Sequence, residues 1–155
     1  MRFGSCPLCD RPPRDTARAM SQENVEIVRR MVDAWNRRDL EVLPVLVHPE
    51  AEYVNSPTAV EPGTRRGYDE ITAVFQTQWE ILLDARQEIE RIYDHGDEIF
   101  VLGRFSRRMP ESETRLEARF LASFTINQGK VTRIRALAFG PTEVQEALET
   151  LGLSE

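Results

Sequence analysis

The feature of this sequence that most constrains its fold is a change of period near residue 85. Beyond this point apolar and polar residues alternate, so that every second side chain lies on the same face, which is typical of β-strands. Four such segments follow one another, at residues 85–94, 98–108, 113–126 and 131–139. Short connections such as "HGD" (95–97) and "NQGK" (127–130) are typical of hairpin turns. These segments therefore predict four consecutive antiparallel strands.

Before residue 85 the apolar spacing is mostly helical. Apolar residues between Val25 and Trp35 fall on one face of a helix, and Ser21 stands where a capping residue would be expected. A short helix is predicted after Asp39 and a longer one over residues 69–83, and Pro141 suits the first turn of a final helix.

The order of these elements predicts an α+β fold. Residues 51–55, "AEYVN", alternate as a short strand, and the Pro- and Gly-rich residues 56–67 predict a loop. We expect one strongly curved antiparallel sheet with three to four helices packed on one face. Such a sheet forms a cone, and the mouth of the cone is where a pocket is expected.

Composition narrows the class of protein. The chain has 155 residues, enough for one domain with a core, and a formal net charge of −6 without a basic stripe. This charge argues against nucleic acid as a partner. No apolar run approaches the length of a membrane span, and no signal-peptide core is found. We therefore expect no membrane partner and a cytoplasmic location.

Residues 1–19 differ from the rest, with three prolines, few apolar residues and both cysteines, Cys6 and Cys9. A structural zinc site needs four ligands, and the chain has no second cysteine pair. We expect no metal site and no cofactor. The segment is predicted to be a disordered leader or an upstream extension, because "MSQENVEIV" from Met20 looks like a natural start. The domain would then cover residues 20–155.

Three stretches carry a family resemblance. They are "VRRMVDAWNRRDLEVLPVLVHPEAEYVNSP" (28–57), "RRGYDEI" (65–71) and "INQGKVTRIRAL" (126–137). With these stretches the chain resembles the nuclear transport factor 2-like superfamily, in its SnoaL-like branch, over about residues 21–153. The resemblance implies the cone-shaped fold and a homodimer formed through the open face of the sheet. It implies less about chemistry, because this fold carries enzymes and binding proteins alike.

The resemblance also indicates where catalytic groups would lie. In limonene-epoxide-hydrolase-like members a tyrosine and an asparagine hold a water beside an Asp-Arg-Asp set. Tyr53, Asn55 and Arg104 match this pattern, but the acid positions hold Ser106 and Ala136. In ketosteroid-isomerase-like members the proton-abstracting carboxylate corresponds to Asn55, and "VTRIRALAF" lacks the acid that SnoaL-like cyclases often carry. Acid–base catalysis needs a titrating group, so no catalytic residue is assigned.

Seven residues are predicted to line a largely apolar pocket. Arg104 would be a buried cation neutralised by a ligand anion, or else a structural arginine paired with a carboxylate. Tyr53 and Asn55 share one strand face, and the aromatic residues form an apolar wall or simply belong to the core. The seven are Tyr53, Asn55, Phe75, Trp79, Arg104, Ser106 and Phe120.

The first functional hypothesis is a protein that binds a small apolar or aromatic ligand, with a negative charge on the ligand as an option. The alternative is a cofactor-independent isomerase, cyclase or epoxide-hydrolase-like enzyme, whose acid would be Glu52, Asp84 or Glu117. A protein-binding module is a third option, although no apolar groove is evident. Alternating arginines such as Arg133 and Arg135 would form charge pairs across a dimer interface or belong to a solvated face.

Overall fold

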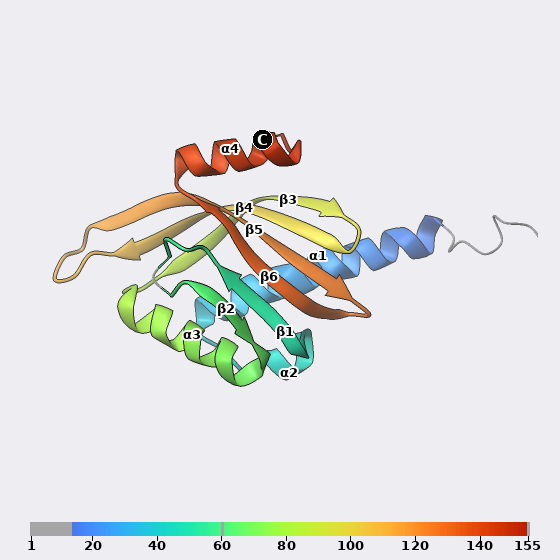
Figure 1. Cartoon of the computed structure of the whole chain (residues 1–155), viewed down its shortest axis with the longest axis horizontal. Coiled ribbons are helices and arrows are strands. Elements are labelled where there is room, and N and C mark those ends of the chain that lie inside the picture. The colour runs from blue at the N-terminus through green and yellow to red at the C-terminus, as the bar shows by residue number, and fades with distance from the viewer. Residues whose placement is uncertain (1–13, 60, 155) are drawn as a thin grey trace, which may run out of the picture.

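The computed structural model describes the backbone of residues 14–59 and 61–154, and the side chains from residue 21 onwards within these ranges. In chain order the elements are α1 (Arg14–Arg37), α2 (Leu43–Leu46), β1 (Val47–Asn55), β2 (Gly63–Arg66), α3 (Gly67–Ile81), β3 (Arg86–His95), β4 (Glu98–Arg108), β5 (Arg115–Asn127), β6 (Lys130–Phe139) and α4 (Pro141–Leu151). The six strands form one curved sheet in the order β2-β1-β6-β5-β4-β3 (Figure 1). The predicted α+β fold is therefore confirmed.

The sheet is antiparallel at every junction except one. The first and last strands, β1 and β6, pair in parallel, with Tyr53 opposite Ile134. The other neighbours, including the long hairpins β3–β4 and β4–β5, are antiparallel. The parallel pair joins β1 to β6, the last strand of the sheet, and so places Tyr53 beside Ile134, some 80 residues later in the sequence.

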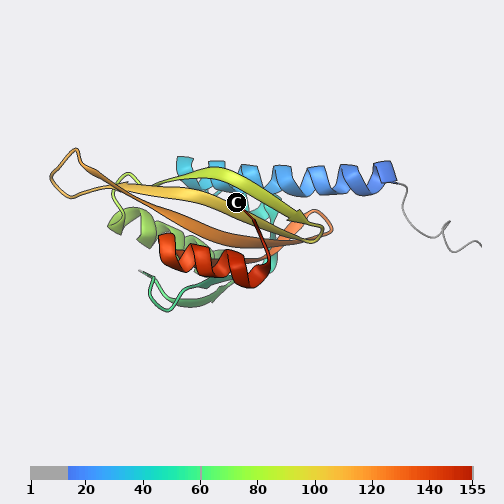
Figure 2. The same cartoon turned by 90° about the horizontal axis from the view of Figure 1, so that it is seen from above.

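Three helices lie on the concave face of the sheet and one lies on the other face. α2 and α3 pack against β1, and α1 runs along β3 and β4. α4 lies across the sheet from α2 and α3, on β5 and β6 (Figures 1 and 2). Each face therefore has a core of its own. The larger core, on the concave face, includes Val28, Ile71, Val101 and Ile126.

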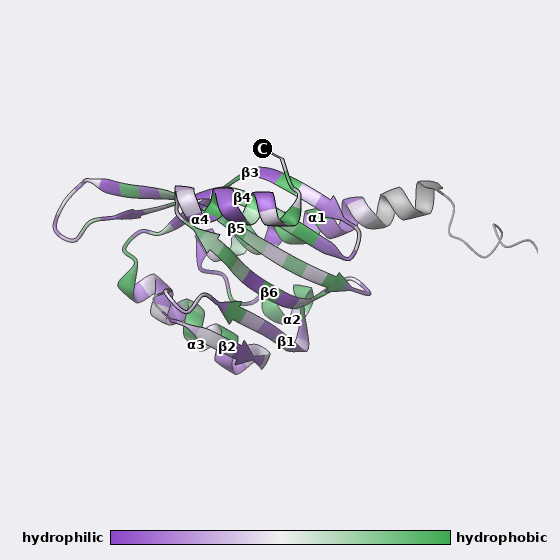
Figure 3. Cartoon of the chain, turned by 45° about the horizontal axis from the view of Figure 1, so that its top comes forward, coloured by the Kyte–Doolittle hydropathy of each residue, from purple (hydrophilic) through white to green (hydrophobic). Residues whose placement is uncertain are grey.

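The second core lies beneath α4. Val144 and Leu148 of the helix are buried against Phe100, Leu102 and Leu121 of the sheet. As a result the middle of β4 is buried on both faces, and residues 99–103 form a continuous buried run. Elsewhere along β5 and β6 hydrophobic and hydrophilic residues form alternating bands (Figure 3).

The N-terminal helix is longer than predicted. α1 begins at Arg14, so residues 14–19 are helical where a disordered leader was expected, and Ser21 lies inside the helix rather than at its cap. The sequence of this extra segment, "RDTARA", contains arginine and alanine, which are good helix formers. Cys6 and Cys9 lie outside the described residues.

The structure also contains a strand that the sequence did not reveal. β2, "GTRR", lies in the segment predicted as a loop and pairs with β1, with Arg65 opposite Tyr53. It is a short edge strand without apolar residues, so it carries no alternation that could be recognised.

Candidate functional site

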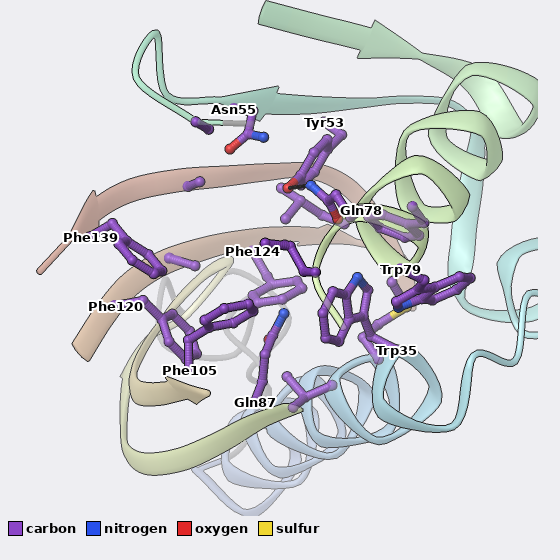
Figure 4. Close-up of a pocket in the computed structure, with 18 of the residues that line it drawn as sticks. Trp35, Tyr53, Asn55, Gln78, Trp79, Gln87, Phe105, Phe120, Phe124 and Phe139 are labelled. Atoms are coloured by element: carbon purple, nitrogen blue, oxygen red, sulfur yellow. Dashed lines mark hydrogen bonds between the residues drawn. The ribbon is translucent and has the colours of Figure 1, made fainter. Parts of the chain in front are cut away.

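A cavity of about 440 Å³ opens between the concave face of the sheet and the helices α1 to α3. Binding sites for small molecules are commonly on the order of 300–1,000 Å³. Eight aromatic residues from both helices and sheet line it (Figure 4). They are Trp35, Tyr53, Phe75, Trp79, Phe105, Phe120, Phe124 and Phe139.

Six of these rings form an unbroken series of neighbours around the cavity. The successive centroid distances are 5.5 Å for Phe139–Phe105, 6.3 Å for Phe105–Trp35, 5.9 Å for Trp35–Trp79, 6.1 Å for Trp79–Phe75 and 5.4 Å for Phe75–Tyr53. All five contacts are tilted or edge-on, which are the favourable geometries for aromatic pairs. The series gives the cavity a wall that is apolar and well packed.

Small side chains keep the sheet side of the cavity open. Ala122 and Ala136 lie opposite each other on β5 and β6, and both line the cavity. The ring of Phe120 lies over Gly103, its cross-strand partner, which has no side chain to push the ring inwards. The volume therefore depends on two alanines and one glycine.

The main polar pair in the cavity is formed by Tyr53 and Gln78. Gln78 Nε2 donates a hydrogen bond to the Tyr53 hydroxyl at 3.1 Å. Burial raises the pKa of Tyr53 above 10.0, against the opposing effects of the Gln78 hydrogen bond and the Arg65 charge. Tyr53 is therefore a neutral phenol, able to donate its own hydrogen.

Asn55 also lines the cavity, but its amide is engaged locally. Nδ2 donates to the backbone oxygen of Glu61 at 2.9 Å, and Oδ1 accepts from the backbone N–H of Ser56 at 3.1 Å. Asn55 is 8% exposed and ties the loop after β1 to the segment before β2. This geometry makes it a structural contact of the cavity wall, with limited capacity left for a ligand.

Two further polar side chains, those of Gln87 and Trp79, contribute to the lining. Gln87 of β3 directs its side-chain amide into the cavity near Phe105 (Figure 4). Trp79 Nε1 is fully buried without a hydrogen-bond partner among the described residues. The helical spacing from Phe75 to Gln78, Trp79 and Leu82 is a signal that could have identified Gln78 from the sequence.

Five of the seven predicted site residues line the cavity and two do not. Arg104 and Ser106 lie on the opposite face of β4. Arg104 is exposed and forms ion pairs with Glu90 at 3.2 Å and Glu117 at 3.7 Å, and the hydrogen bond with Glu90 raises the pKa of its guanidinium. Ser106 Oγ accepts a hydrogen bond from Arg115 at 2.8 Å. The prediction of a buried arginine at position 104 is therefore wrong.

The error at Arg104 has a physical cause. A shift of one residue moves a strand side chain to the other face of the sheet. Because α4 covers one face of β4 and the cavity helices cover the other, Val101 and Leu102 are both buried, and the pattern did not distinguish the faces. The residues that do line the cavity from the end of β4 are Phe105 and Arg107.

Among the residues that the structure describes, two charged side chains line the cavity, and neither was among the predicted site residues. Arg107 is partly exposed, and no hydrogen bond or ion pair of its side chain is found among the described residues. Asp39 follows the end of α1, and its Oδ1 accepts the backbone N–H of Glu41 at 3.0 Å. The sequence indicated Asp39 only as a helix cap.

The three acids considered for catalysis lie outside the cavity lining. Glu52 pairs with Arg66 and Arg133 on the outer face, Glu117 with Arg104, and Asp84 with Arg115 at 2.8 Å. Within the described ranges no group of three histidine, cysteine, aspartate or glutamate side chains could hold a metal ion. In the same part of the chain no helix is long and apolar enough to cross a membrane.

The comparisons with known proteins agree with this architecture. The model of the SnoaL-like domain family matches residues 28–134, so the chain belongs to that family. Its fold is that of nuclear transport factor 2-like proteins. No curated protein gives a significant match to the chain.

Solved structures share the fold at low sequence identity. Bal32a from a soil-derived mobile gene cassette is 20% identical, with a TM-score of 0.67 over 77% of this chain and 91% of that chain. TerC co-crystallized with polyporic acid is 23% identical, with a TM-score of 0.66 over 81% and 97%. A putative SnoaL-like polyketide cyclase from Jannaschia sp. CCS1 is 18% identical, with a TM-score of 0.66 over 90% and 94%. These likenesses establish the fold alone.

Proposed function

We propose that this protein binds a small, flat and largely apolar molecule in the cavity of its concave face. The observation that carries the proposal is the series of six aromatic rings around an open volume of about 440 Å³. Such a wall offers both faces and edges of rings to a planar ligand, and burial of apolar area stabilises the complex. The polar groups on the wall would fix the orientation of the ligand.

The comparisons support a small-molecule ligand in general terms. TerC, which shares the fold, was crystallised with polyporic acid. A hypothetical protein with a ketosteroid isomerase-like fold from Catenulispora acidiphila DSM 44928 was crystallised in complex with trimethylamine. The homodimer and the cytoplasmic location expected from the sequence stay predictions.

The proposal can be tested with N-phenyl-1-naphthylamine, a neutral aromatic dye that becomes fluorescent in apolar surroundings. The chain contains two tryptophans, and both Trp35 and Trp79 line the cavity. Bound dye should therefore quench the tryptophan emission by energy transfer while its own emission rises. Saturable quenching with one site per chain is expected, and a lack of quenching at saturating dye would refute the proposal.

A matched pair of variants ties the signal to the cavity. Ala136→Leu places extra carbon atoms in the cavity and should weaken dye binding severalfold. Ala73→Leu makes the same change on the exposed face of α3 and should leave binding unchanged. Equal effects of the two substitutions would locate the dye elsewhere.

One observation favours a second candidate function, a cofactor-independent isomerase, cyclase or hydrolase. Asp39 places a carboxylate at the cavity, where a general base would be needed. If such an enzyme acts on a ligand of the cavity, Asp39→Asn should abolish turnover while the affinity for the dye is unchanged. Retained turnover in this variant would remove Asp39 as the base.

A further inference from the structure

We propose that Tyr53 and Gln78 select ligands that carry a hydrogen-bond acceptor and a donor on the same edge, as a carboxamide or a lactam does. The inference rests on the proposed function, because it requires the cavity to hold a ligand. It names the polar end of that ligand and the two side chains that recognise it.

The first step is the hydrogen bonding of the pair. The Tyr53 oxygen accepts from Gln78 Nε2, and among the described residues no acceptor is found for the hydrogen of the hydroxyl. Likewise, no donor to Gln78 Oε1 is found in the described part of the chain. The pair therefore keeps unused donors, the Tyr53 hydroxyl hydrogen and the second hydrogen of Gln78 Nε2, beside an amide oxygen that is free to accept on the cavity wall.

The second step is that a ligand in the cavity can reach the free oxygen of Gln78. Fully buried side-chain atoms without a partner, within the described residues, are Trp79 Nε1, Ser123 Oγ and Arg135 Nε. Gln78 Oε1 is not one of them, so it keeps accessible surface, and Gln78 lines the cavity although the residue as a whole is only 7% exposed. A polar group in such a site costs desolvation free energy if it stays without a hydrogen-bond partner. A ligand edge with a complementary donor and acceptor would remove this cost.

The third step is that the pair offers a donor and an acceptor in either orientation of the Gln78 amide. Rotation of the Gln78 amide by half a turn would make Oε1 the acceptor of the Tyr53 hydrogen. The amide NH₂ group would then hold the unused donors and the Tyr53 oxygen would be the unused acceptor, so the pair still offers both kinds of group. The Tyr53 ring is held edge-on against Phe75 at 5.4 Å, which limits where the pair can point.

The fourth step concerns charge. A carboxylate presents acceptors only, so it would satisfy the Tyr53 hydroxyl but face Gln78 Oε1 with a second negative oxygen. Neither Arg107 nor Asp39, the charged residues that line the cavity in the described chain, forms a hydrogen bond with Tyr53 or Gln78. The Arg65 charge acts on Tyr53 from the neighbouring strand, but Arg65 is paired with Glu61 at 3.1 Å. A neutral edge with one acceptor and one donor is the better complement.

The test uses three naphthalenes of one shape, 2-naphthamide, 2-naphthoate and 2-ethylnaphthalene, with dissociation constants measured by calorimetry. Tyr53→Phe and Gln78→Leu should each weaken 2-naphthamide roughly three- to tenfold, the range of one or two neutral hydrogen bonds. Both should leave 2-ethylnaphthalene within about twofold, because it makes no hydrogen bond. Gln76→Leu, which makes the same change on the exposed face of α3 outside the cavity lining, is the matched control and should leave the affinity for 2-naphthamide unchanged.

The outcomes separate the two proposals. Gln78→Leu should not weaken 2-naphthoate, since it removes the oxygen that opposes a carboxylate, and equal weakening of naphthoate and naphthamide would overturn the inference. Unchanged naphthamide affinity in Tyr53→Phe would also overturn it, while binding of 2-ethylnaphthalene would keep the proposed function intact. If none of the three compounds binds the wild-type chain, both proposals fail. Tyr53→Phe suffices if Gln78→Leu does not fold.

Discussion

The ring of Phe120 lies directly over Gly103 on the neighbouring strand. A Cβ atom at Gly103 would stand 2.7 Å from two ring carbons of Phe120 and 2.5 Å from the backbone oxygen of Glu88, closer than real Cβ atoms come. Because Gly103 has no side chain, the ring of Phe120 on β5 packs against β4 and does not fill the cavity. Similar pairs of glycine and an aromatic residue across strands are used to hold curved sheets in register.

The first prediction follows from this contact. Gly103→Ala should lower the free energy of unfolding by about 1–3 kcal/mol, because the methyl group must displace a ring and a backbone carbonyl. The displaced Phe120 ring should also reduce dye binding in the cavity. Denaturant unfolding checks the cause if it compares the two single variants with the double variant Gly103→Ala/Phe120→Ala. Gly103→Ala should lower the free energy of unfolding by less when the Phe120 ring is absent. Strict additivity would show that the ring is not involved.

The second prediction compares two arginines of β4. Arg107 lines the cavity and Arg104 is paired with Glu90 and Glu117 on the other face. Arg107→Ala should weaken binding of 2-naphthoate roughly two- to fivefold, as expected for a partly exposed charge. Arg104→Ala should leave it unchanged. Calorimetric titrations at low and high salt test this, and the reverse order of effects would contradict the placement of the two side chains.

The third prediction concerns Tyr53 at alkaline pH. Burial raises its pKa above 10.0, so the unfolded chain loses the Tyr53 proton at a lower pH than the folded chain does. The contribution of the Tyr53 proton to the free energy of unfolding is therefore complete below the ordinary pKa of tyrosine. It is lost as the pH rises from that value through the higher pKa of the folded state. The free energy of unfolding, measured from about pH 9 to pH 11, should fall less steeply in Tyr53→Phe than in the wild type. Parallel profiles would contradict a raised pKa.

The fourth prediction addresses the second core. Leu148 of α4 is 1% exposed, and Leu148→Ala should cost about 2–5 kcal/mol of folding stability because it leaves a cavity beneath the helix. Leu151→Ala, at a position 39% exposed on the same helix, should cost less than about 1 kcal/mol. Thermal and denaturant unfolding provide the measurement. Dye affinity should be unchanged in both, since α4 lies on the face opposite the cavity, and a loss of affinity would show that the two cores are coupled.

Much of the fold could be predicted from the sequence because its signals are strong and local. The strands β3 to β6 each span ten residues or more and are separated by recognisable turns such as "HGD" and "NQGK", and α3 has a clear apolar face. The strand β2 could not be predicted, since "GTRR" owes its conformation to pairing with β1 and not to its own residues. The start of α1 was misplaced because prolines and cysteines further upstream dominated the interpretation of residues 1–19.

The site could be predicted only in part, and the limit was geometrical. Tyr53 and Phe75 could be placed because each stands on an element with one buried face. Phe120 could be placed because it alternates along its strand with the charged Glu117 and Arg119. Arg104 could not, because β4 is buried on both faces and a side chain there has no preferred direction in the pattern. Asp39 lies between two helices, where its side chain direction depends on the path of the loop.

The position of α4 has a consequence for the order in which the fold is completed. The helix follows β6 in the chain, yet its residue Leu148 covers Phe100, Leu102 and Leu121. The hydroxyl of Tyr93 donates to the backbone oxygen of Ser154 at 2.5 Å, so the segment after α4 is tied to β3. Until α4 docks, these apolar side chains on the convex face are exposed to solvent, and a folding intermediate without the helix is prone to aggregation.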